Sequence, residues 1–161
     1  MATPADDAAP GQLQRFTNDN IERASTRGVE ALVRSRLWSF LSVDMSYTYL
    51  FSLDRANDRP LPGRSEHRVT ARILVEADEL GFVGWARGSW VGEAFFFQQS
   101  DDGSDQTLRA QPFVSFDARV EQRIIEHVSA FVGIENLFGA GDAVLVPLLP
   151  RSAYAGINGR Y

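Results

Sequence analysis

The sequence predicts an all-β fold made of about seven long antiparallel strands, and three observations support this prediction. Apolar and polar side chains alternate along most of the chain. The alternating segments run well beyond the roughly 5–6 residues of a typical soluble strand. The connections between the segments alternate between short and long. Because successive side chains of a strand point to opposite faces, each segment has one apolar and one polar face.

The alternation is clearest in residues 37–51, where Val43, Met45 and Tyr47 share one face and Asp44 and Ser46 lie on the other. Four further segments follow the same pattern, and two are less regular, because 20–34 alternates only at its end and 80–97 is rich in glycine on its apolar face. The predicted strands are therefore 20–34, 37–51, 66–77, 80–97, 113–124, 128–138 and 151–161.

The length of the segments and the purity of their apolar face favour a membrane. A tilted membrane strand needs about 9–11 residues. A transmembrane barrel turns its apolar face to lipid and keeps its polar face in the lumen, whereas a soluble barrel buries its apolar face inside. In every clean segment the apolar face is nearly free of charge. We therefore expect an antiparallel up-and-down transmembrane β-barrel segment, in which seven strands form an incomplete barrel.

The connections predict which end of each strand faces outside. The short ones are 34–37, 78–80 and 126–127, and the long ones are 54–65, 98–111 and 139–150. Short turns of such barrels face the periplasm and long loops face outside. Since the last strand follows a long loop, we expect a periplasmic C-terminus.

Aromatic residues near the strand ends are typical of two interfacial girdles. The alternative is the general preference of aromatic residues for strands. The outer girdle would contain Tyr49, Phe51, Phe95, Phe96, Phe97, Phe113 and Phe138, and the inner one Trp38, Phe40, Phe82, Trp85 and Tyr161.

Composition excludes several classes of function. The net charge of -5 and the absence of a basic stripe argue against nucleic-acid binding, and the absence of cysteine removes thiolate chemistry. His67 and His127 are isolated and show no metal-ligand spacing, and no nucleophile motif occurs, so we expect no cofactor and no enzyme.

The start of the chain has no signal-peptide pattern. We expect a disordered segment at 1–13 and the barrel portion at 14–161.

Four segments, taken together, resemble TonB-dependent outer-membrane receptors. Asn20 to Glu30 is similar to the "Asn…Ala…Arg-Gly-Val-Glu" strand of that family. Ser46 to Tyr49, with Leu61-Pro62-Gly63-Arg64 and His67, resembles the next hairpin. Val132 to Phe138 resembles the penultimate strand, and Pro150 to Tyr161 resembles the final one. The resemblance covers about 14–161 and indicates the C-terminal part of the family's barrel.

The resemblance implies uptake of a scarce nutrient, such as an iron-siderophore or cobalamin, across the outer membrane of a Gram-negative cell. In the family an N-terminal plug fills a 22-stranded barrel, and the TonB complex energises it through a preceding segment. We expect neither plug nor partner-binding segment within these residues, so the chain would be a receptor fragment. Gly156, Ile157 and Tyr161 fit a terminal signal read by the barrel-assembly machinery; the alternative is an ordinary last strand.

Charged residues of the polar face are the candidate site, facing either a plug or a passing ligand. The other interpretation is a hydrated wall with weak cross-strand charge pairs. The candidates are Glu30, Arg68, Arg72, Asp117, Arg119, Glu121 and Arg123.

Two alternative functions remain open at the level of sequence. Residues 12–18 could add an eighth strand and close a small structural or pore-forming outer-membrane barrel. The chain could also be a soluble β-barrel module whose apolar face lines a ligand cavity.

Overall fold

The computed structural model describes residues 23–99, 105–142 and 144–159, which contain ten strands and no α-helix. The strands are β1 (Ala24–Trp38), β2 (Leu41–Asp54), β3 (Arg59–Pro60), β4 (His67–Ala77), β5 (Phe82–Val91), β6 (Ala94–Gln99), β7 (Asp105–Ala110), β8 (Phe113–Ile125), β9 (Val128–Glu135) and β10 (Ser152–Gly159). Within the described residues, no helix could cross a membrane.

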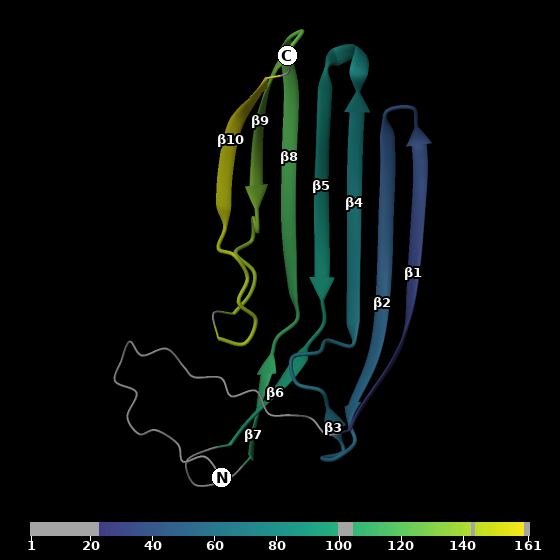
Figure 1. Cartoon of the computed structure of the whole chain (residues 1–161), viewed down its shortest axis with the longest axis vertical. Helices are drawn as coiled ribbons and strands as arrows, with labels where there is room; N and C mark the ends of the chain where they lie inside the picture. Colours follow the sequence, from purple (N-terminus) through teal and green to yellow (C-terminus); the bar gives the residue numbers. More distant parts are fainter. Residues whose placement is uncertain (1–22, 100–104, 143, 160–161) are drawn as a thin grey trace, which may run out of the picture.

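The seven predicted strands form one antiparallel sheet, in the order β1-β2-β4-β5-β8-β9-β10, and β3 adds a short pairing with β2. Each long strand pairs with the next long strand along the chain, which is the up-and-down order expected. Figure 1 shows these strands side by side, with the short turns at one end and the long connections at the other. The all-β antiparallel fold class is confirmed.

The register joins the apolar sides of all seven strands into one surface, called here the apolar face. One row of this face runs from Val43 through Ile73, Ala86 and Ala118 to Ile134. The polar sides form a second continuous surface, called here the polar face. This separation follows from the period of two, because a slip of one residue would exchange the two faces.

No described part of the chain covers the apolar face. Ala94 and Ala110, in the β6–β7 hairpin, are the only buried hydrophobic residues among those described. Val33, Ile73 and Val132 are 64%, 47% and 52% exposed. A soluble module would bury these side chains to gain roughly 25 cal/mol per Å² of apolar surface. The described sheet therefore lacks the closed apolar interior that the soluble alternative needs, and its uncovered apolar face fits a lipid-facing wall.

The described sheet does not close into a barrel. β1 and β10 stand at the two ends of the strand order, and neither pairs with another described strand there. Open strand edges do not occur in contact with lipid, because their backbone groups would lack hydrogen-bond partners. Residues 12–18, which would supply the eighth strand of a small closed barrel, lie outside the described residues, and the described sheet needs further strands to complete the wall.

The bounds predicted for the strand 80–97 are wrong. The structure has a 3₁₀ turn at Asp78–Leu80, then β5, and β6 begins only after a break. At this break Gly92 donates its N–H to the carbonyl oxygen of His67 at 2.9 Å, and a Cβ on Gly92 would lie 3.2 Å from that oxygen. β6 pairs instead with β7 in a separate two-stranded sheet, so the predicted loop 98–111 contains the end of β6 and the whole of β7.

Other boundaries shift by a few residues. β1 continues to Trp38, and β9 ends at Glu135 because Asn136 adopts a left-handed conformation with φ of 47°. The loop 54–65 contains β3. The expected disordered segment 1–13, the start of the first predicted strand and Tyr161 lie outside the described residues.

Candidate functional site

A row of charged side chains crosses the polar face at mid-strand. The register places Arg34 on β1 opposite Asp44 on β2, and then Arg72, Arg87 and Asp117 on β4, β5 and β8. We call these five residues the charge row. Arg34 Nε donates to Asp44 Oδ1 at 2.8 Å, and Arg87 donates to Asp117 Oδ2 through Nη2 at 2.7 Å and Nε at 3.1 Å.

Arg72 is the cation of the charge row that lacks a carboxylate among the described residues. Its guanidinium lies 5.8 Å from the ring centroid of Trp85, and no ion pair joins it to Asp44. Arg68, four residues earlier on β4, faces the same side and also forms no described ion pair. Because neither guanidinium group has a carboxylate partner among the described residues, β4 is the part of the polar face best suited to meet an anion.

A second cluster lies nearer the short turns. Arg119 Nη2 donates to Glu121 Oε2 at 2.9 Å, and its guanidinium stands 3.9 Å from the ring centroid of Phe131. Glu121 Oε1 also accepts from Asn158 Nδ2 at 3.2 Å and from the hydroxyl of Ser129. These bonds connect β8, β9 and β10, so Arg119 and Glu121 have partners within the wall.

Asn136 joins the polar face to the long connection after β9. Its N–H donates to Asp117 Oδ1 at 2.9 Å, so the same carboxylate holds Arg87 and Asn136. The side chain of Asn136 donates to the carbonyls of Ala140 at 2.8 Å and Leu149 at 2.9 Å, and accepts from Ala140 N–H at 2.8 Å. Asn136 is 7% exposed, so these bonds are shielded from water. The residue thus holds both ends of the connection.

Asp142 orders the tip of the same connection. Its Oδ1 accepts the N–H groups of Leu145 at 2.8 Å and Val144 at 2.9 Å. These two backbone bonds favour the carboxylate and hold the pKa of Asp142 below its usual range. The apolar segment around Val144 to Leu149 therefore follows a defined turn.

The other long connections contact each other at the same end of the sheet. The N–H of Gly63 donates to the carbonyl oxygen of Phe95 at 2.8 Å, and the guanidinium of Arg59 lies 4.2 Å from the ring centroid of Phe97. The β6–β7 hairpin thereby packs on the connection that holds β3 (Figure 1). These contacts build a surface beyond the ends of the long strands.

The remaining predicted residues lie apart from the charge row. Glu30 shares the polar face and faces Thr48 in the register, and no described side chain pairs with its carboxylate. Arg123 contacts the short turn, where its Nη2 donates to the carbonyl of Asp78 at 2.9 Å. Ile157 is on the apolar face and is 75% exposed.

Gly156 has a packing role in the described sheet. It lies opposite Phe131, and a Cβ on Gly156 would come within 2.5 Å of the ring of Phe131. Gly133 is related in the same way to Tyr154, and the two rings meet edge to face at 6.2 Å between centroids. Each glycine makes room for the aromatic ring of the opposite strand.

Sequence reasoning did not select Arg34, Asp44, Arg87 or Asn136 as site residues. The alternation pattern does place Arg34, Asp44 and Arg87 on the polar face. Which charges stand opposite one another depends on the register of strands that are far apart in sequence. Asn136 lies within the segment Val132 to Phe138 that resembles the family's penultimate strand, but its hydrogen bonds could not be predicted from the sequence.

We expect Asp117→Ala to cost more stability than Arg87→Gln. Asp117 is 13% exposed in its side chain, and its loss leaves the N–H of Asn136 without its acceptor, at a cost of about 1–3 kcal/mol. Arg87 is 52% exposed, so the ion pair by itself contributes at most about 1 kcal/mol. Urea unfolding of the assembled barrel in lipid vesicles measures both, and equal costs would contradict this role for Asp117.

A sheet of long antiparallel strands with one uncovered apolar side and one charged side is the arrangement of a section of a transmembrane β-barrel wall. Residues 1–137 match the family described as "TonB dependent receptor-like, beta-barrel". The chain therefore belongs to the TonB-dependent receptor β-barrel family. Relatives in this class are transporters and not enzymes. A search of the curated proteins found no match.

Solved structures share this fold. FpvA of Pseudomonas aeruginosa, solved with pyoverdines bound, is 14% identical with a TM-score of 0.73, over 84% of this chain and 19% of FpvA. The ferric-catecholate import receptor Fiu of E. coli is 17% identical with a TM-score of 0.63, over 84% and 21%. The copper transporter OprC is 16% identical with a TM-score of 0.64, over 84% and 24%. The chain thus spans about a fifth of the length of these receptors.

Proposed function

We propose that this chain is the C-terminal section of an outer-membrane receptor that takes up a scarce nutrient in a TonB-dependent manner. The observation that carries the proposal is the continuous charged face opposite a continuous uncovered apolar face, in a chain of this family. The ligand class we favour is an iron-siderophore, because FpvA and Fiu are named for such ligands. Cobalamin and copper are the other candidates, copper because OprC is named for it.

In the proposed orientation the short turns and the C-terminus face the periplasm, and the long connections face outside. The last residues of β10 lie beside the start of β9, at the end of the sheet with the short turns. Outer-membrane lipid covers the apolar face, and strands outside the described sheet continue the wall at β1 and β10. The barrel-assembly machinery inserts the wall, with the region of Gly156, Ile157 and Tyr161 as its signal.

The polar face would surround a plug, through which the TonB complex acts. Arg68 and Arg72 have no carboxylate partner among the described residues, so they are the groups of the wall that would meet acidic plug residues or an anionic ligand. Arg34, Arg87 and Arg119 are already paired with carboxylates and would mainly hold the strands in register.

Energy-dependent uptake tests the proposed function. Cells with the intact coding region are compared with cells in which residues 23–161 are deleted in frame, using ⁵⁵Fe-labelled siderophores, labelled cobalamin and copper. We expect loss of uptake of one ligand, and a protonophore should abolish the same uptake in intact cells. Unchanged uptake of all three ligands would contradict the proposal.

The double variant Arg68→Gln/Arg72→Gln tests the role of β4. Each charge-assisted hydrogen bond contributes about 1.5–3 kcal/mol, so we expect the apparent KM of uptake to rise by about tenfold or more. Arg34→Gln is the matched control, because it removes an arginine of the same face that is paired with Asp44 at 2.8 Å. If the control raised KM as much as the double variant, the arginines of β4 would be ordinary parts of a hydrated wall.

A further inference from the structure

The apolar face carries a cationic patch at the end of β1 and β2 farthest from the short turns. Among the paired positions of this face in the described strands, Arg27 is the only one occupied by Asp, Glu, Lys or Arg. It lies opposite Phe51. Its guanidinium stands 4.8 Å from the ring centroid of Phe51. Charge is excluded from the rest of this face, so the position of Arg27 calls for a physical reason.

Two further arginines adjoin Arg27. The N–H of Arg55 donates to the carbonyl oxygen of Arg23 at 2.9 Å, which places these residues opposite each other in continuation of the β1–β2 register. Like charges directly opposite each other on a sheet are destabilising unless an anion joins them. None of the three arginines forms an ion pair with a described residue. We call Arg23, Arg27 and Arg55 the arginine patch.

A cavity lies within this patch. It has a volume of about 500 Å³, and Arg27, Arg55, Phe51 and Leu53 line it. Asp58 is its one carboxylate. Cationic groups and apolar side chains thus border the same hollow, which suits a ligand with an anionic head and an apolar tail.

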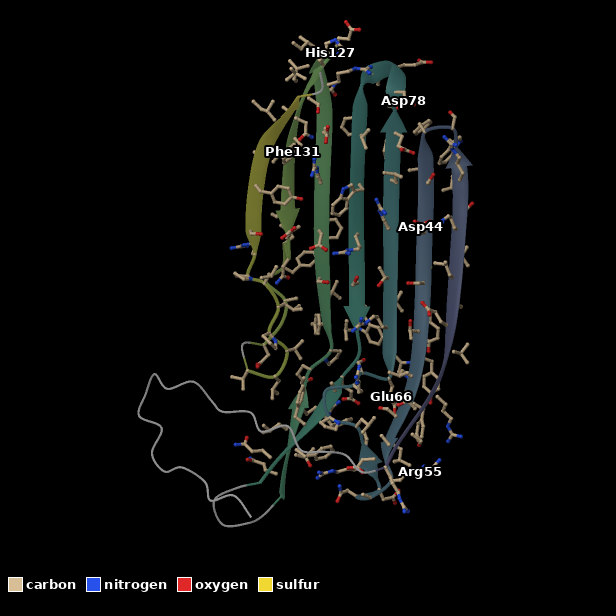
Figure 2. The ribbon with its side chains drawn as sticks, in the orientation of Figure 1. Asp44, Arg55, Glu66, Asp78, His127 and Phe131 are labelled. Carbon is tan, nitrogen blue, oxygen red and sulfur yellow. The ribbon has the colours of Figure 1, made fainter. Side chains whose placement is uncertain are left out.

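The height of the patch matches a membrane interface. Strand β2 begins at Leu41, opposite Trp38, and rises about 33 Å to Phe51 at ~3.3 Å per residue. At a tilt of ~40° this rise spans about 25 Å, which is the height of the apolar band of an outer-membrane barrel. Arg27 therefore lies at the boundary of the band, and Arg55 lies roughly 10 Å beyond it at the same tilt. Figure 2 shows Arg55 at the end of the molecule opposite Asp78 and His127.

We propose that the arginine patch binds the phosphate of an anionic lipid headgroup in the outer leaflet, with the acyl chains of that lipid on the apolar face beside Phe51. The outer leaflet is specified by the orientation given under the proposed function. Arginine pairs with phosphate through two parallel N–H donors, and the charge of both groups strengthens these bonds. The bound phosphate would also relieve the repulsion between Arg23 and Arg55.

Lipid binding by the complete receptor barrel that contains this chain, in dodecyl maltoside micelles, tests this proposal, with titration by native mass spectrometry. The probes are bis-phosphorylated lipid A, the same lipid without phosphates, and inorganic phosphate alone. The triple variant Arg23→Gln/Arg27→Gln/Arg55→Gln should bind the phosphorylated lipid about 100-fold more weakly, at roughly fivefold per arginine. The control Arg34→Gln/Arg68→Gln/Arg72→Gln removes the same charge from the polar face and should change binding by less than about threefold.

Equal losses in the two triple variants would overturn the proposal, because they would show attraction by net charge alone. Equal binding of the lipid without phosphates would show acyl contact only, and equally tight binding of inorganic phosphate would show a site for the free anion. If far-UV circular dichroism shows that the triple variant loses its strands, the single variant Arg55→Gln tests the proposal instead, and its affinity for the phosphorylated lipid should fall about fivefold. The assay involves no transport, so its result is independent of the uptake experiment.

Discussion

Ile73→Arg is expected to destabilise the assembled barrel by about 2–4 kcal/mol, the cost of an arginine at the bilayer midplane on the lipid face of such barrels. Ile73 is in the middle of β4, is 47% exposed, and has Val43 and Ala86 as its cross-strand neighbours. None of these neighbours can pair with a guanidinium. The free energy of unfolding, measured by urea titration in lipid vesicles, should fall by this amount.

Thr70→Arg is the matched control. Thr70 lies on the same strand but on the polar face, where its hydroxyl lies 3.3 Å from that of Ser89. An arginine there meets water and other polar groups, so we expect a change below about 1 kcal/mol. If Thr70→Arg were the more costly variant, the apolar face would be the inner one, and the assignment of lipid to this face would fail.

Asn136→Ala is expected to cost about 4–5 kcal/mol and to release the connection between β9 and β10. The substitution removes three side-chain hydrogen bonds at a buried position, each worth about 1 kcal/mol or more when its partner is left unsatisfied. It also places alanine at a φ of 47°, which disfavours residues other than glycine and asparagine by about 1–2 kcal/mol. Urea unfolding and limited proteolysis within 137–149 measure the two consequences.

Two variants separate these causes. Asn136→Gly keeps the positive φ without strain but loses the side-chain bonds, so it should recover only the backbone part of the loss. Asn158→Ala removes one exposed bond of 3.2 Å to Glu121 and should change stability by less than about 1 kcal/mol. Wild-type resistance of the connection in Asn136→Gly would show that the side-chain bonds do not hold it.

The alternation of side chains was sufficient to predict the class of fold. It identified the seven long strands, their order along the chain and the membership of the two faces, because the period of two is a local property of each strand. The short and long connections were readable for the same reason. The β6–β7 hairpin was missed, since the break at Gly92 depends on contacts with Ser65 and His67 across the sheet.

The sequence by itself determined that one side of these strands is nearly free of charge and the other is not, because that division follows from alternate residues. Only the tertiary structure decided which charges meet. The register brings Arg87 to Asp117 and leaves Arg72 without a carboxylate among the described residues. It sets Asn136 between Asp117 and Leu149, and gathers Arg23, Arg27 and Arg55 at one end of the apolar face. These contacts join residues separated by long stretches of chain, and cross-strand hydrogen bonding, not local preference, selects them.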